Sequence, residues 1–305
     1  MNSAVLTPFT ARDGEILALY DWGADAWEDS GCAALQPRAI VLMVHGLGEH
    51  AGRYEGVAQR LLDWGFAVRA YDQRGHGESG GARGALPYET ALLDDLAEVI
   101  DETRLLCMRL PQAAGALDMR IPPLPLILLG HSLGGLVAAR LLALKLRSVD
   151  GLVLSSPALD AGLSGAQKLL LAVMPGVAPD LCVGNGLDAR YLSHDARVVH
   201  DYLADRRVHD RISPRLGKFI ATAGPATIAA AANWNTPTLL MYAGDDRLVK
   251  PAGSRVFAEM AASSPAVRAG MVTALRFDGL YHELFNEADA EPVFDTLKAW
   301  LDARF

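Results

Sequence analysis

The sequence predicts an α/β fold with a mostly parallel, doubly wound sheet and a helical insertion. Apolar runs of strand length alternate with helix-length segments through the first half of the chain and again near its end. Between them, residues 158–235 show helical segments but no strand runs. With 305 residues, 51% of them hydrophobic, the chain can bury one large core. We therefore predict a core domain built from residues 1–157 and 236–305, with a helical cap at 158–235.

The predicted elements follow in order from the N-terminus. An Arg-Asp-Gly turn at Gly14 separates Phe9 from the alternating stretch 15–22, which is typical of a hairpin. Continuous apolar runs predict strands at 39–44, 66–71, 124–129, 151–155, 238–242 and 273–277. Helices are predicted around 54–64, 88–109, 133–146, 253–262 and 292–305. The cap should cover the C-terminal edge of the strands, where open α/β sheets bind ligands.

Composition excludes several classes of function. The formal charge of −8 and the scattered Lys and Arg residues argue against nucleic acid as a partner, because phosphate binding needs clustered cations. Three cysteines, Cys32, Cys107 and Cys182, lack CxxC spacing, so neither a disulfide framework nor a metal site is predicted. The N-terminus has no signal-peptide pattern, and the chain has no apolar run of membrane-spanning length. We expect a soluble cytoplasmic protein, and the sequence leaves its oligomeric state open.

A glycine-flanked serine carries the strongest chemical signal. Gly-His-Ser-Leu-Gly at 130–134 matches the GxSxG pattern and lies after a predicted strand and before a predicted helix. Such a turn lifts the serine hydroxyl out of the sheet and places it at a helix N-terminus, where partial positive charge favours an oxyanion. The alternative is that the glycines only make a tight turn and Ser132 caps the helix. The context favours Ser132 as a nucleophile.

A serine nucleophile needs a base and an acid, which on such a sheet follow later strands in the order acid, then histidine. Asp245 and Asp246 follow the predicted strand at 238–242, and His282 follows the one at 273–277. His282 is the only histidine after residue 209, so it is the candidate base. Asp246 is favoured as the acid, with Asp245 as a turn residue. Each position alone could be a turn or surface residue.

Glycine loops follow two other strands. The loop His-Gly-Leu-Gly-Glu-His at 45–50 could supply one oxyanion-hole N–H from Leu47, with Leu133 supplying the other. Its glycines also resemble a dinucleotide-binding pattern, with Asp72 as a ribose ligand, but the spacing GxGxxxG is one residue too long. The loop at 71–79 is interpreted as a tight turn without chemistry.

With these residues in place, the chain resembles the α/β-hydrolase superfamily and, within it, the monoacylglycerol lipase and lysophospholipase family. The resemblance covers about residues 5–303 through the blocks HGLGEHAGRY, YDQRGHGES, GHSLGG, LSSPAL, GDDRLV and FDGLYHE. It implies Ser132 as nucleophile, His282 as general base and Asp246 as orienting acid. It also implies Leu47 and Leu133 as oxyanion-hole residues, and Glu49 and Arg53 as polar contacts to the substrate. Phe285 departs from the pattern, because some members have a second histidine there.

The resulting hypothesis is a serine hydrolase that cleaves monoacylglycerols or lysophospholipids through an acyl-enzyme, without metal or cofactor. The apolar stretch 166–183 could line an acyl tunnel or lie on a lipid surface, or simply pack the cap on the core. The charged stretch 192–216, with His194, His200 and His209, is interpreted as solvated cap surface. Alternatives are a general carboxylesterase for short to medium acyl esters and a binding protein without catalysis.

Overall fold

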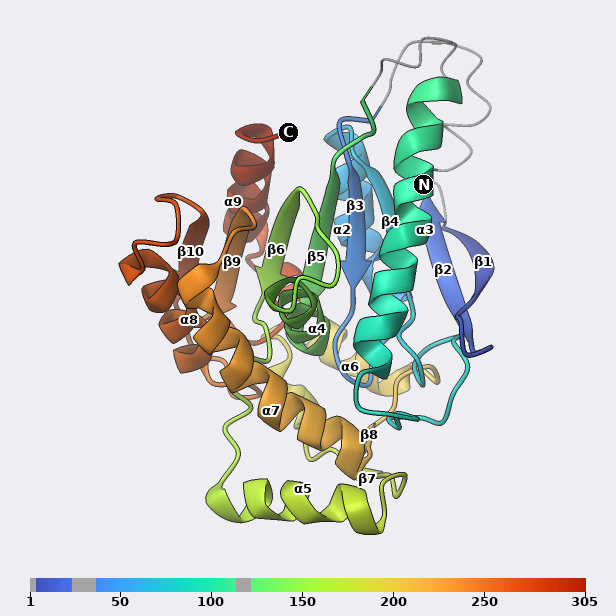
Figure 1. Ribbon diagram of the computed structural model, residues 1–305, viewed down its shortest axis with the longest axis vertical. Coiled ribbons are helices and arrows are strands. Elements are labelled where there is room, and N and C mark those ends of the chain that lie inside the picture. The colour runs from blue at the N-terminus through green and yellow to red at the C-terminus, as the bar shows by residue number, and fades with distance from the viewer. Residues whose placement is uncertain (1–3, 24–36, 114–121) are drawn as a thin grey trace.

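An eight-stranded sheet forms the centre of the molecule (Figure 1). The computed structural model describes residues 4–23, 37–113 and 122–305. The strands are β1 (Val5–Thr10), β2 (Ile16–Trp22), β3 (Ile40–Val44), β4 (Ala67–Tyr71), β5 (Leu126–His131), β6 (Gly151–Ser155), β9 (Thr238–Ala243) and β10 (Val272–Phe277). Their order is β1-β2-β4-β3-β5-β6-β9-β10, and all neighbours from β4 to β10 are parallel. The β1–β2 hairpin is antiparallel, so the predicted α/β fold with a mostly parallel sheet is confirmed.

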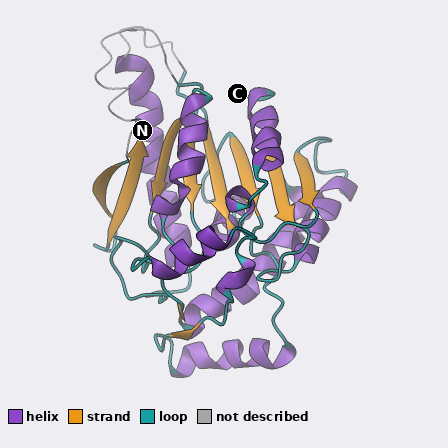
Figure 2. Ribbon diagram, turned by 180° about the vertical axis from the view of Figure 1, so that it is seen from behind, coloured by secondary structure: helices purple, strands orange, loops and turns teal. Residues whose placement is uncertain are grey.

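Helices cover both faces of this sheet (Figure 2). On one face lie α3 (Ala91–Ala113), α4 (Ser132–Ala143) and α8 (Pro251–Ser263), and on the other lie α2 (Glu55–Asp63) and α9 (Glu291–Asp302). Alternate residues of β3 serve the two layers: Leu42 packs in the α3–α4 core, and Met43 packs in the α2–α9 core. Burial on both sides explains why the strands are continuous apolar runs rather than alternating ones.

Residues 158–235 contribute no strand to the large sheet. They form α5 (Gly165–Val177), α6 (Ala196–Ala204) and α7 (Pro214–Ala230), which lie below the C-terminal ends of the parallel strands in Figure 1. They also form a small antiparallel pair, β7 (Val183–Gly184) with β8 (Arg211–Ile212), where no strand was predicted. The two-residue length of these strands explains why no apolar run marked them.

The cap is tied to the core through α7. Leu216, Phe219 and Ala223 of α7 belong to the same buried cluster as Leu136 of α4. At the opposite side of the cap, α5 starts with a capping box in which Ser164 and Gln167 satisfy each other's backbone N–H groups. The division into a core and a separate cap domain stays a prediction, because α7 shares the hydrophobic core.

The remaining sequence predictions concern thiols, metals and membrane spans. Cys107 and Cys182 are free thiols, and Cys32 lies outside the described residues. Within the described ranges, no three or more His, Cys, Asp or Glu side chains lie close enough together to hold a metal ion. None of the helices in these ranges is long and apolar enough to cross a membrane.

Candidate active site

Ser132 lies at the sharp turn between β5 and α4. Its φ of 51° is in the left-handed region, which non-glycine residues rarely adopt. The motif glycines allow the turn to pack: a Cβ on Gly134 would lie 2.1 Å from the Val44 carbonyl oxygen, and one on Gly130 would lie 2.7 Å from the Gly134 oxygen. Strand and helix can therefore approach closely enough to hold Ser132 in this strained conformation.

His282 and Asp246 meet in the loops that follow β10 and β9. The Nδ1 of His282 is 2.7 Å from Oδ2 of Asp246, and both side chains are buried. The other oxygen of Asp246 accepts hydrogen bonds from the N–H groups of Leu248 and Val249 at 2.9 and 3.0 Å. The carboxylate is thereby fixed against the imidazole. The neighbouring Asp245 is exposed, so the structure pairs His282 with the aspartate that the sequence favoured.

The pKa values of this pair follow from its charges. Burial lowers the pKa of His282, but the Asp246 carboxylate outweighs burial and raises this pKa above its ordinary value. Burial raises the pKa of Asp246, but His282 and the two backbone donors outweigh it and lower that pKa. The carboxylate therefore remains charged, and the imidazole is a stronger base than a free histidine.

The loop at 45–50 lies directly beside Ser132. A Cβ on Gly46 would lie 3.2 Å from Cβ of Ser132. The Gly46 N–H donates to Oε1 of Glu49 at 2.6 Å, and the Gly48 carbonyl accepts from the N–H of His209 at 2.9 Å. Leu47 lies between these two fixed glycines and lines the same cavities as Ser132. The candidate oxyanion donor is thus held on both sides.

A second loop supports the first. The N–H of Gln73 donates to Nε2 of His45 at 2.8 Å, and its side-chain amide donates to the His45 carbonyl at 2.6 Å. Asp72 is fully buried and accepts from the N–H of Ala51 at 2.7 Å and from the Tyr20 hydroxyl at 2.9 Å. The loop at 71–79 therefore positions both ends of the candidate oxyanion loop. Asp72 is occupied by internal bonds, which speaks against a role as ribose ligand.

Glu49 and Arg53, predicted as substrate contacts, belong to a buried ion network with Glu283. The Arg53 guanidinium donates to Oε2 of Glu49 at 2.5 Å and to the two oxygens of Glu283 at 2.6 and 2.8 Å. Burial raises the pKa of Glu49, but the charge of Arg53 outweighs it and lowers this pKa to about 2. Glu49 and Glu283 line the cavity beside Ser132, and Arg53 lies behind them. Sequence reasoning missed Glu283, whose one available signal was its position directly after His282.

Phe285 packs into the core. It is buried, its ring lies 5.2 Å from that of Phe294 in α9, and it joins the cluster on that face of the sheet. The position at which the sequence departs from the resembled family is therefore an aromatic core contact in this chain.

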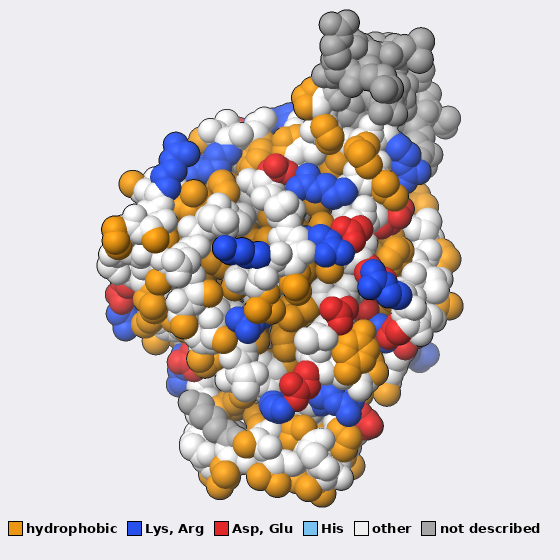
Figure 3. Space-filling view, viewed as in Figure 1, with side chains coloured by type: hydrophobic (Ala, Val, Ile, Leu, Met, Phe, Trp, Pro, Cys, Tyr) orange, Lys and Arg blue, Asp and Glu red, His pale blue; other side chains and the backbone are white. Residues whose placement is uncertain are grey.

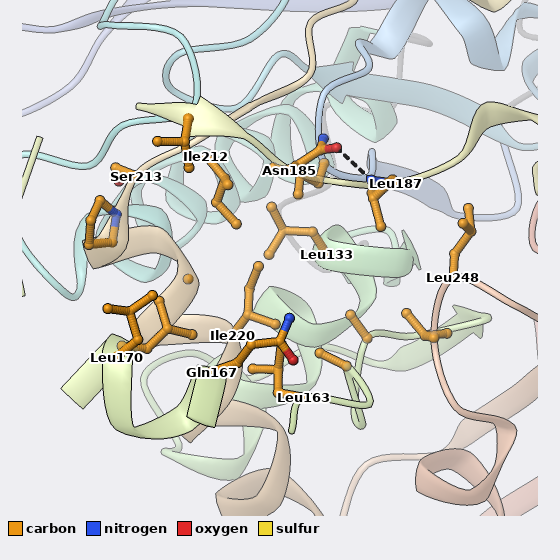
Figure 4. A pocket seen from close by; sticks show the side chains of 18 of the residues that line it. Leu133, Leu163, Gln167, Leu170, Asn185, Leu187, Ile212, Ser213, Ile220 and Leu248 are labelled. Atoms are coloured by element: carbon orange, nitrogen blue, oxygen red, sulfur yellow. Dashed lines mark hydrogen bonds between the residues drawn. The ribbon is translucent and has the colours of Figure 1, made fainter. Parts of the chain in front are cut away.

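Two cavities meet at Ser132. The first, of about 410 Å³, is apolar and reaches between α5 and α7. Its wall includes Leu133, Leu163, Leu170, Leu171, Met174 and Ile220, several of which point into it in Figure 4. The second, of about 750 Å³, contains most of the polar groups, among them Glu49, His131, Asp188, Tyr202, Asp205 and His282. Leu47, Ser132, Asn185, Leu187 and Leu248 line both cavities. Both volumes are in the range of small-molecule sites.

The histidine-rich stretch of the cap contacts the core. The prediction of a solvated surface is wrong for His209, which is half-buried and whose Nε2 lies 3.0 Å from the Gly75 carbonyl oxygen. His194 is exposed as predicted, and its Nδ1 also lies 2.9 Å from Oε1 of Glu287. His200 is exposed as expected. The charge density of the stretch hid these contacts, because the partners are distant in sequence.

Replacing Gly48 with alanine is expected to lower kcat by about 10²-fold through displacement of Leu47. Gly48 has φ +79°, and an added Cβ would lie 2.3 Å from the His209 carbonyl oxygen. The matched control is Gly14→Ala in the β1–β2 turn, where φ is +89° and nothing lies within 4 Å. It should lose stability by about 1–3 kcal/mol but keep kcat. Steady-state kinetics and thermal melts of both variants test this, and equal kcat values for the two would contradict it.

One family model and several known proteins are similar to this chain. The model described as serine aminopeptidase S33 matches residues 35–289. A monoacylglycerol lipase of Mycolicibacterium smegmatis is 36% identical over 268 residues, covering 87% of this chain and 88% of the relative. A phospholipase of Bacillus subtilis is 30% identical, covering 93% of this chain and 99% of the relative. The crystal structure of a monoacylglycerol lipase from Paleococcus ferrophilus has a TM-score of 0.74 at 31% identity, covering 89% and 97% of the two chains.

Proposed function

The chain belongs to the serine aminopeptidase S33 family of α/β hydrolases, and on that premise we propose that it cleaves the ester bond of monoacylglycerols. The resemblance predicted from the sequence is confirmed at the level of this family. In the proposed reaction Ser132 is the nucleophile, His282 the general base and Asp246 the acid that orients it. No metal or organic cofactor takes part in this chemistry.

The observation that carries the proposal is the position of Ser132 between an apolar and a polar cavity. An ester with a long acyl chain and a polar alcohol has the same division, with the carbonyl at the boundary. Its acyl chain would lie in the cavity between α5 and α7, and its alcohol would face Glu49 and His282. A short symmetrical ester would leave the apolar cavity unfilled.

The reaction takes two steps. His282 accepts the Ser132 proton as the hydroxyl oxygen attacks the ester carbonyl, and the N–H groups of Leu47 and Leu133 stabilise the oxyanion by roughly 3–4 kcal/mol each. The tetrahedral intermediate then collapses, and the bond between the acyl carbon and the alcohol oxygen breaks. The departing alcohol takes the proton from His282, and the acyl group stays on Ser132 as an acyl-enzyme. Water then attacks this ester with His282 again as base, which releases the fatty acid and restores Ser132.

Electrostatics favour a neutral glycerol over a phosphate-bearing headgroup. The polar cavity has carboxylates at Glu49, Asp188, Asp205, Asp210 and Glu283 along its wall. Among the described residues, Arg190 is the one arginine along this wall, and it is paired with Asp188 at 2.6 Å. A phosphate needs a free cation, whereas glycerol hydroxyls can donate to carboxylates. Monoacylglycerol is therefore the preferred member of the predicted substrate pair, ahead of lysophospholipid.

A substrate panel tests this assignment. The same acyl chain is offered on glycerol, on glycerophosphocholine, in a triacylglycerol and on p-nitrophenol, at several chain lengths. We expect kcat/KM for monoacylglycerols to rise by about fourfold per added CH₂ until the apolar cavity is filled, because each buried CH₂ contributes about 0.8 kcal/mol. Highest activity on short esters would favour the general carboxylesterase instead. If the protein hydrolyses none of these esters and a fluorophosphonate does not label Ser132, the protein is a binding protein instead.

The cap also presents an apolar surface to solvent, visible along the lower edge of Figure 3, where α5 lies. Leu169 is 69% and Val177 72% exposed. Leu170, which lines the apolar cavity, is also 57% exposed. We infer that this side of α5 contacts the lipid surface from which the substrate enters. The cytoplasmic location expected from the sequence stays a prediction.

A polar residue on α5 should weaken such contact. Leu169→Asp is expected to lower the hydrolysis rate of monoacylglycerol embedded in phosphatidylcholine vesicles and to leave the rate on a dissolved short ester unchanged. Leu105→Asp, at an exposed position of α3, is the matched control and should change neither rate. Equal loss on both substrates for Leu169→Asp would indicate damage to the cavity rather than loss of a lipid contact.

A further inference from the structure

Glu287 is a buried carboxylate in the loop that carries His282. Its side chain is only 1% exposed. One oxygen accepts from the N–H of Tyr281 at 2.6 Å, and the other accepts from the N–H of His194 at 2.9 Å and lies 3.3 Å from the Ser193 hydroxyl oxygen. The imidazole Nδ1 of His194 lies 2.9 Å from the first oxygen. Glu287 therefore joins the peptide that precedes His282 to the cap.

The backbone around Glu287 forms a seam between the same two segments. The N–H of Glu283 donates to the Leu192 carbonyl at 2.8 Å, and the N–H of His282 donates to the Tyr191 carbonyl at 3.4 Å. Ser193 closes the seam by donating from its hydroxyl to the Asn286 carbonyl at 2.8 Å. Cap residues 191–194 thus lie along residues 282–287 of the histidine loop.

The charge of Glu287 strengthens this seam. Burial raises the pKa of Glu287, but the N–H donors of Tyr281 and His194 outweigh it and lower this pKa. The side chain is therefore a carboxylate, and hydrogen bonds to an ionised acceptor are about twice as strong as neutral ones. The shortest of them, 2.6 Å, reaches the residue next to the catalytic histidine.

We propose that Glu287 is a positioning residue that holds His282 in place and couples it to the cap. Asp246 fixes the imidazole through Nδ1, whereas Glu287 fixes the main chain that carries the imidazole. Without Glu287, the loop would lose its anchor at Tyr281, and the imidazole would move relative to Ser132. The proposal rests on the proposed function, because it assumes that His282 is the base for Ser132.

If Glu287 had a purely structural role, its replacement would have a different effect from the loss of a positioning residue. If Glu287 only stabilised the fold, its loss would reduce the number of folded molecules, and each remaining active site would turn over at the normal rate. The test therefore measures kcat per active site, with sites counted by stoichiometric fluorophosphonate labelling of Ser132. Thermal melts of each variant report the change in stability separately.

We expect Glu287→Ala to lower kcat per titrated site by about 10²-fold with little change in KM. Glu287→Gln keeps the shape and one acceptor oxygen for the Tyr281 N–H, so its loss should be smaller, and it serves if the alanine variant folds poorly. The control is Glu291→Gln, an exposed glutamate paired with Arg60, which should keep full activity. The acidic limb of kcat/KM in Glu287→Ala should also move to lower pH, because a displaced imidazole loses part of the stabilisation by Asp246.

Normal kcat per site and an unchanged pH profile in both Glu287 variants would overturn the proposal. The rate of fluorophosphonate labelling is measured in parallel on all four proteins, since it requires an activated Ser132 but no lipid. If the wild type labels rapidly but does not hydrolyse monoacylglycerol, the substrate assignment fails alone, and slower labelling of the Glu287 variants still supports the positioning role. Equal labelling rates in wild type and variants would again overturn it.

Discussion

Replacing Ser132 with alanine is expected to lower kcat on a p-nitrophenyl ester by about 10⁶-fold. The variant has no nucleophile, so the acyl-enzyme cannot form. Both cavities remain, and the candidate oxyanion donors at Leu47 and Leu133 are backbone groups that the change does not remove. Substrate binding should therefore persist, with a residual rate of about 10³–10⁴ over the uncatalysed reaction.

The measurement is steady-state turnover together with the equilibrium binding of a non-hydrolysable ether analogue of monoacylglycerol. Ser263→Ala, an exposed serine on α8, is the control and should match the wild type. The double variant Ser132→Ala/His282→Ala should be about as impaired as Ser132→Ala, because the two groups act in one step. A Ser132→Ala variant with wild-type turnover would refute the assignment of the nucleophile.

Much of this architecture could be predicted because its causes are local in the sequence. Strands buried on both faces require continuous apolar runs, so β3, β5 and β6 could be recognised by composition alone. Parallel strands bring their C-terminal ends to one edge of the sheet. Ser132, Asp246 and His282 each follow such an end, and for this reason their order along the chain predicted that they would lie near one another.

The residues that support the site could not be predicted in the same way. Asp72, His209, Glu283 and Glu287 act through contacts between loops that are far apart in the chain, and these contacts depend on tertiary packing. The charged stretch 192–216 illustrates the problem. Its composition is that of a solvated surface, yet His194 and His209 bind the loops that carry His282 and Leu47. Charge density therefore does not predict which side chains of this stretch bind a partner in the core.

The adjacent residues Asp245 and Asp246 allow a matched pair of substitutions, one of which should strongly lower kcat. Asp246→Asn is expected to lower kcat by about 10⁴-fold, because an amide cannot hold the imidazole in the tautomer that accepts the Ser132 proton or stabilise the imidazolium. Asp245→Asn should leave kcat unchanged, since that side chain is exposed and makes none of the contacts of the pair. Both substitutions remove one charge from the same turn, so a general electrostatic effect would appear equally in both variants.

The pH dependence of kcat/KM provides an independent measure of the contact between Asp246 and His282. Activity requires neutral His282, and the Asp246 carboxylate raises the pKa of His282 above its ordinary value. The acidic limb of kcat/KM in the wild type should therefore lie above about pH 6.5, the value for an unperturbed histidine. In Asp246→Asn this carboxylate is absent while burial still lowers the pKa, so the limb should move to lower pH even as the plateau falls. A limb that stays in place in Asp246→Asn, or that moves in Asp245→Asn, would show that another group sets the basicity of His282.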